Sequence, residues 1–326
     1  AFWVLAKHAG AWDLLRLAPG WLLYEFWKAL QALTVKPWLL RAQVERLAGL
    51  RAMARRRRAL RLTEGGGPKR TSGALQAIEM NLRDAQAPAY DALTGGPYHE
   101  AVESAACLER LAAGPGERIV DLGCGTGRLL PALVARGARV FGADFSLASL
   151  KIARQKAPGA VLVQADLTRL PFKPGVFDRA VSHHVLHHLP DAAGRRKVLG
   201  EAARTLRKEG EIVLTCYNDA LLKRLLSPRE ERHPGGIFYH RFRPGELRRL
   251  FEGCFDILED TGIRHIPARS IGERLFTRPG FRWLPALDRR LERSRISRLL
   301  AHLWLVRARV RSGAQTTGCG GGEVNP

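Results

Sequence analysis

A glycine-rich turn directly after an apolar strand constrains this chain more than any other feature. Residues 120–127 read Val-Asp-Leu-Gly-Cys-Gly-Thr-Gly, so Gly123, Gly125 and Gly127 alternate behind Asp121. Glycine has no Cβ and tolerates positive φ, which lets a backbone approach a ligand closely. Dinucleotide-binding folds space their glycines as G-x-G-x-x-G, whereas this turn reads G-x-G-x-G. The turn therefore predicts a strand–turn–helix ligand site that differs from the dinucleotide type.

Strands and helices alternate after this turn. We expect strands over 138–143, 160–163, 177–182 and 211–215, and a helix over 195–206. Such alternation predicts an α/β fold with a mostly parallel sheet, helices on both faces and a ligand at the carboxyl ends of the strands. Asp144 ends the second strand, where a carboxylate can accept hydrogen bonds from both hydroxyls of a ribose. The commoner role of a strand-end aspartate, a helix N-cap, stays open for both Asp121 and Asp144.

The ordered set of motifs resembles the type 11 branch of the class I S-adenosylmethionine (SAM) methyltransferases, over about residues 85–310. The resemblance implies a Rossmann-like fold, SAM as cofactor and methyl transfer as activity. In that family Asp166 would face the adenine amino group and Leu167 would lie behind the ring. The cofactor residues that the resemblance implies are Asp121, Gly123, Cys124, Gly125, Gly127, Asp144, Asp166, Leu167 and His183.

Four histidines follow the fourth expected strand, at positions 183, 184, 187 and 188. Histidines at i and i+4 can bind zinc, but the His-Glu-x-x-His pattern is absent, so we expect no metal. The resemblance implies that this segment lines the pocket beneath the transferred methyl group. A base is needed only if the acceptor must lose a proton, and His187 and His188 are the two candidates. The alternative for both is capping of the following turn.

A second stretch, Tyr239-His240-Arg241-Phe242, precedes Pro244-Gly245-Glu246-Leu247. It is similar to a stretch of the methyltransferases that modify the wobble uridine of tRNA, which need a basic surface for phosphates. In the type 11 branch, the same device places an aromatic side chain and an arginine over the acceptor pocket. We therefore expect Tyr239, His240 and Arg241 to bind the substrate. Thr215-Cys216-Tyr217-Asn218 departs from the usual tRNA-enzyme pattern after strand five.

The first 62 residues form an expected helical segment rich in tryptophan and arginine. The chain carries a net charge of +22, which indicates an anionic partner. No uncharged stretch in this segment reaches the length of a membrane span, so we expect it to lie in an anionic membrane interface. A helical hairpin packed on a neighbouring domain is the alternative. The segment also resembles the carboxyl-terminal tail of family 2 glycosyltransferases.

Composition completes the expected organisation. Residues 63–73 are rich in glycine and predict a flexible linker, and residues 313–326 predict a disordered tail. The methyltransferase domain is expected over 74–312. Its leader, with Tyr90-Asp91 and Tyr98-His99, would cap the cofactor in the family. Five cysteines without a C-x-x-C pair indicate a reduced, cytoplasmic environment. Together with the amino-terminal segment, this predicts a protein that lies peripherally on the cytoplasmic face of the membrane.

Three functions remain open at this point. The leading hypothesis is methyl transfer from SAM to a small or lipid- or glycan-linked acceptor at the membrane surface. The second is modification of tRNA by the same kind of catalytic domain. The third is a non-catalytic module that binds SAM. The sequence does not identify the acceptor atom or the oligomeric state.

Overall fold

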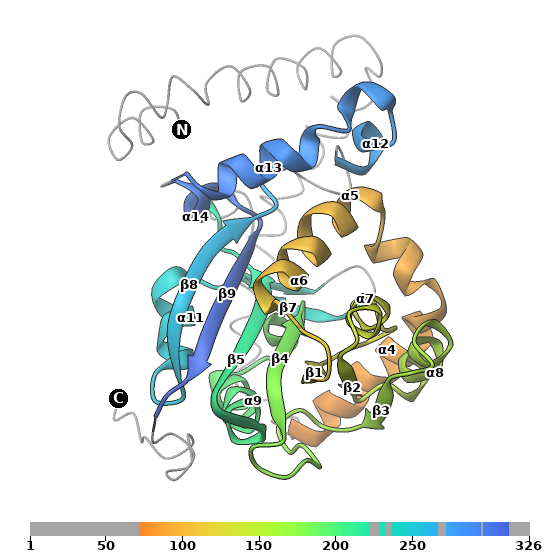
Figure 1. The fold of residues 1–326 in the computed structure, drawn as a ribbon, viewed down its shortest axis with the longest axis vertical. Helices are drawn as coiled ribbons and strands as arrows, with labels where there is room; N and C mark the ends of the chain where they lie inside the picture. The colour runs from red at the N-terminus through yellow and green to blue at the C-terminus, as the bar shows by residue number, and fades with distance from the viewer. Residues whose placement is uncertain (1–71, 222–228, 233–235, 267–271, 295, 313–326) are drawn as a thin grey trace, which may run out of the picture. The chain divides into compact units, whose positions relative to one another are not determined.

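The computed structural model describes residues 72–221, 229–232, 236–266, 272–294 and 296–312 (Figure 1). The expected amino-terminal segment 1–62, most of the linker and the expected tail 313–326 lie outside these residues. The last two residues of the expected linker, Ser72 and Gly73, belong to a helix.

A seven-stranded sheet with the strand order β3-β2-β1-β4-β5-β9-β8 forms the centre of the described fold (Figure 1). Strands β1 to β5 pair in parallel, and β9 runs antiparallel to both β5 and β8. This arrangement confirms the expected mostly parallel, Rossmann-like sheet. The strands are β1 (Arg118–Leu122), β2 (Arg139–Asp144), β3 (Val161–Gln164), β4 (Phe177–His183), β5 (Leu206–Tyr217), β8 (Phe255–Ile263) and β9 (Leu303–Val310).

Helices cover both faces of the sheet (Figure 1). Apolar residues of α9 and α11 join one buried cluster, and those of α6, α7 and α8 join the other. The helices are α4 (Ser72–Thr94), α5 (Pro97–His99), α6 (Ala105–Leu111), α7 (Leu130–Ala135), α8 (Leu147–Lys156), α9 (Ala192–Thr205), α11 (Pro244–Phe251), α12 (Glu273–Phe276), α13 (Leu284–Glu292) and α14 (Ser297–Leu300). Shorter elements are the π-helical turn η2 (Glu100–Ser104), the 3-10 turns η3 (Leu186–His188) and η5 (Pro279–Phe281), and the hairpin of β6 (Glu230–Arg232) and β7 (Phe238–His240).

The sequence of β9 shows why this sheet is buried on both sides. Successive side chains of a strand point to opposite faces. Leu303 and Leu305 lie in the cluster with α6 to α8, whereas Trp304 and Val306 lie in the cluster with α9 and α11. The continuous apolar run of β9 therefore contributes side chains to the buried clusters on both faces of the sheet.

The start of β5 differs from the expected strand. We expected a strand over 211–215, whereas β5 already begins at Leu206. Glu209 has a φ of +59°, and the pairing between β4 and β5 shifts register between Phe177 and Arg179. The irregular backbone at Glu209 is therefore accommodated inside one long strand. Helix α9 ends at Thr205, close to the expected position.

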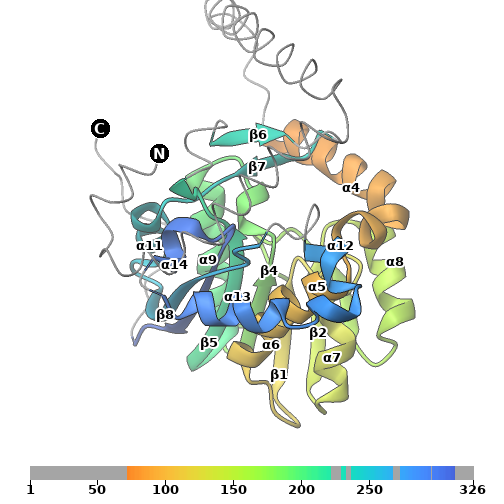
Figure 2. The ribbon, with the colours of Figure 1, turned by 90° about the horizontal axis from the view of Figure 1, so that it is seen from above.

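The strand order reverses at β1, because β2 and β3 lie on one side of it and β4 and β5 on the other. Ligands of open α/β sheets bind outside the carboxyl ends of the strands at such a switch point. The glycine turn after β1 and the histidine segment after β4 both lie at this position. Helix α4 contacts α8 beside the same end of the sheet (Figure 2). Among the described residues, no helix combines the length and the apolar content needed to cross a bilayer.

Candidate active site

The glycine turn after β1 has backbone angles that residues with a side chain rarely adopt. Gly123 has a φ of +80° and Gly125 a φ of +52°. A Cβ added at Gly123 would lie 2.4 Å from Val185 Cγ2, so the segment after β4 packs directly on the turn. A Cβ added at Gly125 would meet nothing within 4 Å. The turn therefore needs glycine at position 123 for packing and leaves open space above position 125.

Two buried carboxylates flank this turn. Asp144 Oδ2 accepts a hydrogen bond of 2.8 Å from the Gly125 amide, and Oδ1 accepts one of 2.8 Å from the Ser146 amide. Asp121 is buried, and its Oδ1 has no hydrogen-bond partner in the described part of the chain. Burial, followed by the charge of Asp144, raises the pKa of Asp121 to about 8. The site therefore contains an acid that carries a proton at neutral pH.

Helix α4 closes over the turn through polar contacts. Ser146 Oγ donates to Asp84 Oδ1 over 2.5 Å, and Thr126 Oγ1 donates to Asp91 Oδ1 over 2.8 Å. Asp91 also forms an ion pair with Lys156 of α8. Helix α4 of the leader is therefore hydrogen-bonded both to the glycine turn and to the segment that follows β2.

The other expected cofactor residues lie nearby with different surroundings. Asp166 Oδ1 accepts hydrogen bonds of 2.8 Å from the amide and the hydroxyl of Thr168, which fixes the turn after β3. Leu167 is buried in the cluster with α9 and α11. Cys124 is buried in the cluster with α6 to α8, with Sγ against Gly142 of β2. The Cys124 side chain thus belongs to the core, and only the backbone of residue 124 lies in the turn.

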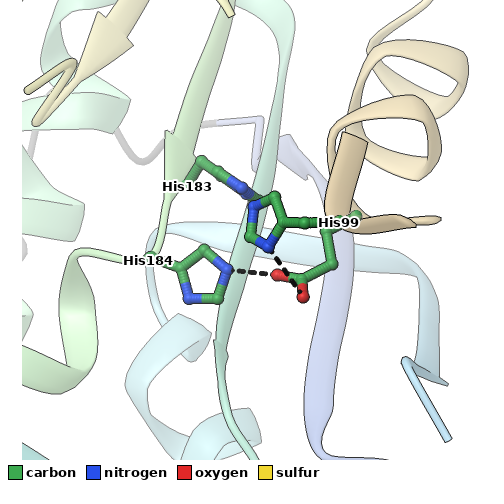
Figure 3. Close-up of side chains that lie close together, drawn as sticks. His99, His183 and His184 are labelled. Atoms are coloured by element: carbon green, nitrogen blue, oxygen red, sulfur yellow. Dashed lines mark hydrogen bonds and ion pairs between the residues drawn. The ribbon is translucent and has the colours of Figure 1, made fainter. Parts of the chain in front are cut away.

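The histidine segment after β4 meets the end of the leader helices (Figure 3). His183 Nδ1 lies 2.9 Å from Thr215 Oγ1 and 3.4 Å from Cys107 Sγ. His184 Nε2 donates to Glu103 Oε2 over 2.5 Å, and His99 Nδ1 lies 3.1 Å from Glu103 Oε1. Glu103, fully buried in η2, therefore joins histidines from two distant parts of the chain.

Glu103 and His184 differ in their charge at neutral pH. Burial raises the pKa of Glu103, but the charge of Arg264 and the contacts with His99 and His184 outweigh burial and hold that pKa well below its usual value. Burial lowers the pKa of His184 to about 4. At neutral pH, Glu103 is therefore ionised and His184 is neutral.

The same cluster has the composition of a metal site. One ligand atom from each of His99, Glu103, His183 and His184 lies within 4.8 Å of the others. Three imidazoles and a carboxylate suit zinc or another transition metal. Two guanidinium groups, however, lie in the cluster: Arg128 contacts His99, and Arg264 pairs with Glu103. Their positive charges oppose a divalent cation at this position.

A wall of aromatic rings continues from the histidines to the end of β5. The Tyr217 ring stacks on His187 with a centroid distance of 4.0 Å, and it meets Tyr239 at 5.5 Å and His184 at 5.9 Å. His187 is fully buried. His188 Nδ1 donates to the Phe238 carbonyl over 2.6 Å, which ties η3 to β7. We refer to His184, His187, Tyr217 and Tyr239 as the ring wall.

Of the three expected substrate residues, only Tyr239 belongs to the ring wall; His240 and Arg241 do not. The Tyr239 hydroxyl donates to Glu231 over 2.7 Å. His240 is buried between Glu230 and Glu246, with N–O distances of 2.9 and 2.7 Å. Arg241 is buried, with Nε 3.9 Å from Asp219. Neither side chain presents its charge to the solvent.

The comparisons with known proteins agree with this geometry. Residues 120–214 match a family model described as "Methyltransferase domain". A putative methyltransferase of Encephalitozoon cuniculi is 31% identical over 170 residues, which are 48% of this chain and 75% of that protein. The chain belongs to the class I SAM-dependent methyltransferases. This family confirms the enzyme class and the SAM cofactor that the motifs predict.

A second sequence relative and a solved structure are also similar to this methyltransferase. Demethylmenaquinone methyltransferase of Beutenbergia cavernae is 36% identical over 114 residues, which are 35% of this chain and 46% of that protein. The chain spans about half the length of the demethylmenaquinone methyltransferases it matches. The N-methyltransferase NodS of Bradyrhizobium japonicum, solved with S-adenosylhomocysteine (SAH), superposes with a TM-score of 0.51. It is 15% identical, with 72% of this chain and 99% of NodS covered, and it supports the fold alone.

The described residues of the methyltransferase fit SAM. The open space above Gly125 would admit the cofactor against the backbone, and the Asp144 carboxylate lies where β2 ends. Asp121 supplies a buried acid that a cationic ligand would ionise. These features match the amino-acid and ribose ends of SAM in charge and in position along the sheet.

Sequence reasoning did not assign roles to Asp84 and Glu103. Both lie in the leader, far along the chain from the residues that they contact. Histidine and glutamate at positions 99 and 103, one helical turn apart, were the local signal for Glu103. Nothing in the sequence near Asp84 distinguishes it from a solvent-exposed helical acid.

Proposed function

We propose that this methyltransferase transfers the methyl group of SAM to a hydroxylated ring of a small acceptor, which is attached to a lipid or a glycan. The main observation that supports this proposal is the ring wall. His184 and His187 follow β4, Tyr217 ends β5 and Tyr239 belongs to β7, and Val185, next to His184, packs on the glycine turn. Aromatic side chains stack favourably on flat ligands and leave few polar groups to satisfy. The printed name of the Beutenbergia relative supports an acceptor of this kind.

The proposed cofactor contacts follow from the fold. We assign the ribose hydroxyls to Asp144, the amino-acid end to Asp121 and the glycine turn, and the adenine to Asp166 and Leu167. The sulfonium of SAM makes its methyl carbon electrophilic. The protein contributes mainly by holding the acceptor in line with that carbon, which can account for most of the rate.

His187 and His188, the expected base candidates, have contacts that suit other roles. His187 stacks on Tyr217 inside the ring wall, so we propose that it shapes the acceptor pocket. His188 donates to a backbone carbonyl of β7, so we propose that it holds η3 in place. His183 lies against Thr215 and Cys107 and would support the floor of the pocket.

The surroundings of His240 and Arg241 favour a small acceptor over tRNA. A phosphate backbone is bound by exposed basic side chains. Both side chains are buried and lie against carboxylates of this chain. Their role in the proposal is therefore to hold Tyr239 in the ring wall.

The net charge of +22 supports an anionic membrane as the place where a lipid-linked acceptor is met. The resemblance of the first 62 residues to a glycosyltransferase tail supports a glycan on the same lipid. We expect residues 1–326 to bind vesicles that contain phosphatidylserine, and residues 74–326 to bind them much more weakly. Equal binding of both proteins would place the membrane contact in the methyltransferase domain.

The proposed function is tested with tritiated SAM and three probes: demethylmenaquinol, 4-nitrocatechol and a tRNA transcript. Calorimetry first establishes that SAM binds. We expect label in the hydroxylated rings and none in the tRNA. Label in tRNA alone would refute the proposal, and SAM binding without transfer to any hydroxylated ring would refute the acceptor class.

A further inference from the structure

We propose that His184 is the general base of the reaction, that it accepts the hydroxyl proton of the acceptor at Nδ1, and that Glu103 positions it. This inference rests on the proposed function, because only an acceptor with an ionisable hydroxyl needs such a base. His184 lies in the ring wall next to Val185, which packs on the glycine turn. The assignment differs from the two histidines that the sequence favoured.

The hydrogen bonds around Glu103 fix which nitrogen of His184 carries a proton. A carboxylate only accepts hydrogen bonds, so His184 Nε2, at 2.5 Å from Glu103, must be the donor. His184 is neutral, which leaves the lone pair on Nδ1. No hydrogen bond within the described residues uses this Nδ1. A histidine whose second nitrogen is held by a buried carboxylate is the arrangement of the base in serine hydrolases.

Glu103 is itself held in one orientation. Arg264 pairs with one carboxylate oxygen, and His99 lies 3.1 Å from the same oxygen. Arg128 can only donate, so His99 accepts from it at Nε2 and donates to Glu103 at Nδ1. Figure 3 shows His99 and His184 converging on the carboxylate from two sides. The carboxylate thus keeps its charge and can stabilise a protonated His184.

The backbone departs from regular geometry at His184, at Glu103 and at Arg264, which pairs with Glu103. His184 has a φ of +61° and Arg264 a φ of +58°, both in the left-handed region that non-glycine residues rarely adopt. Glu103 lies in the π-helical turn η2. Strained backbone and π-helical turns cluster at functional sites. Three such features around one carboxylate are expected if its position serves catalysis.

The proposed step conserves atoms and charge. The acceptor O–H bond breaks, and its proton passes to His184 Nδ1. The electron pair of the oxygen forms the new bond to the methyl carbon, while the methyl–sulfur bond of SAM breaks and its pair remains on sulfur. The products are a methyl ether, SAH and a protonated His184, which Glu103 stabilises until the proton leaves to solvent.

The groups that face His184 determine its pH response. They come from the leader, from the end of β4 and the segment after it, from β5 and from the segment after β8. These groups are His99, Glu103, His183, His187, Tyr217 and Arg264. Burial is the largest effect and disfavours the protonated form of His184; Glu103 favours that form, whereas His99 and Arg264 oppose it, so the pKa of His184 is lowered to about 4. Methyl transfer should therefore fall only on the acid side of neutrality.

The test uses residues 1–326 with SAH and 4-nitrocatechol, whose ionised form absorbs visible light. We expect bound 4-nitrocatechol to ionise at least one pH unit below its value in free solution. His184→Asn should abolish this shift and lower methyl transfer about 10²- to 10⁴-fold, while SAM binding stays unchanged. Asparagine tolerates positive φ, so this variant preserves the backbone. Glu209→Asn, at a φ of +59° in the exposed first part of β5, is the matched control and should change neither readout.

Glu103→Gln tests the positioning residue by the same absorbance shift, and Glu103→Asp should restore part of it. The proposal is overturned if His184→Asn leaves the ionisation intact, or if the wild-type protein binds SAH but does not bind or ionise 4-nitrocatechol. A stoichiometric transition metal in the purified protein would also overturn it, because His184 and Glu103 would then be ligands. Failure of the wild-type protein to bind SAM would instead refute the proposed function, and the base with it.

Discussion

The buried acid at the end of β1 should couple SAM binding to proton release. Burial, followed by the charge of Asp144, raises the pKa of Asp121 to about 8, so the free enzyme carries a proton on Asp121 at neutral pH. SAM brings a sulfonium and an ammonium group, and nearby positive charge favours the ionised carboxylate. Binding should therefore release up to one proton at any pH between the pKa of the complex and that of the free enzyme.

The sign and size of the pH effect follow from this coupling. Between pH 6 and pH 7, SAM affinity should rise about tenfold, because each SAM that binds releases about one proton in this range. An α-amino group stays largely protonated there, so the ligand contributes little. Calorimetry in two buffers of different ionisation enthalpy measures the released proton directly.

Asp121→Asn is the matched variant for this prediction. It keeps the size of the side chain and removes the titration, so its SAM affinity should be nearly flat from pH 6 to pH 7. The reasoning is refuted if the wild-type affinity is equally flat and no proton is released. It is also refuted if Asp121→Asn shows the same pH dependence as the wild type.

Three further predictions concern the turn and the buried cluster. Asp144→Ala should weaken SAM binding by about 1.5–3 kcal/mol, because a charged acceptor is lost, and calorimetry measures this change. Gly123→Ala should destabilise the fold more than Gly125→Ala in urea unfolding, since only the former places a Cβ 2.4 Å from Val185. Glu103→Gln should lower the free energy of unfolding by about 3–5 kcal/mol, because it leaves the mostly buried Arg264 without its charged partner. The pKa of Glu103 is lowered by folding, so this contribution is present above the usual carboxyl pKa and is lost only in acid, which urea unfolding at several pH values would show.

The sequence predicted the parts of the site that depend on local spacing. The glycine turn and the acid at the end of β2 lie within short segments whose strands are apolar and whose turns are marked by glycine. Their positions could be read because a parallel sheet brings the carboxyl ends of its strands to one edge. The strand limits of β2, β3 and β4 accordingly differ from the expected ones by a residue.

The acceptor side could not be predicted in the same way. His184 and Glu103 are separated by 81 residues, and no local pattern pairs them. The choice among four neighbouring histidines depends on backbone angles, and the positive φ of His184 has no signature in the residues around it. Likewise, His240 and Arg241 form a basic motif in the sequence, but the carboxylates that surround them come from other elements.

A second buried histidine–carboxylate pair provides a comparison for the proposed base. Asp288 is fully buried and accepts from Tyr98 Oη at 2.6 Å and from His265 Nδ1 at 2.7 Å. His265 Nε2 lies 2.9 Å from Ser297 Oγ, so both ring nitrogens have partners and the network is closed. His184 has the same carboxylate contact, yet no described hydrogen bond engages its Nδ1. Closed networks stabilise a fold, whereas an available lone pair can accept a proton.

The two histidines should therefore respond differently to the same substitution. His265→Asn should lower the free energy of unfolding by about 1–3 kcal/mol, because buried Asp288 and Ser297 lose partners, and should leave the ionisation of bound 4-nitrocatechol unchanged. His184→Asn should abolish that ionisation, and Glu103 would retain the Arg264 and His99 contacts. Urea unfolding and the absorbance titration, performed on both variants, separate the two roles. If His265→Asn abolished the ionisation while His184→Asn only destabilised the fold, the distinction between closed and open networks would be wrong for this enzyme.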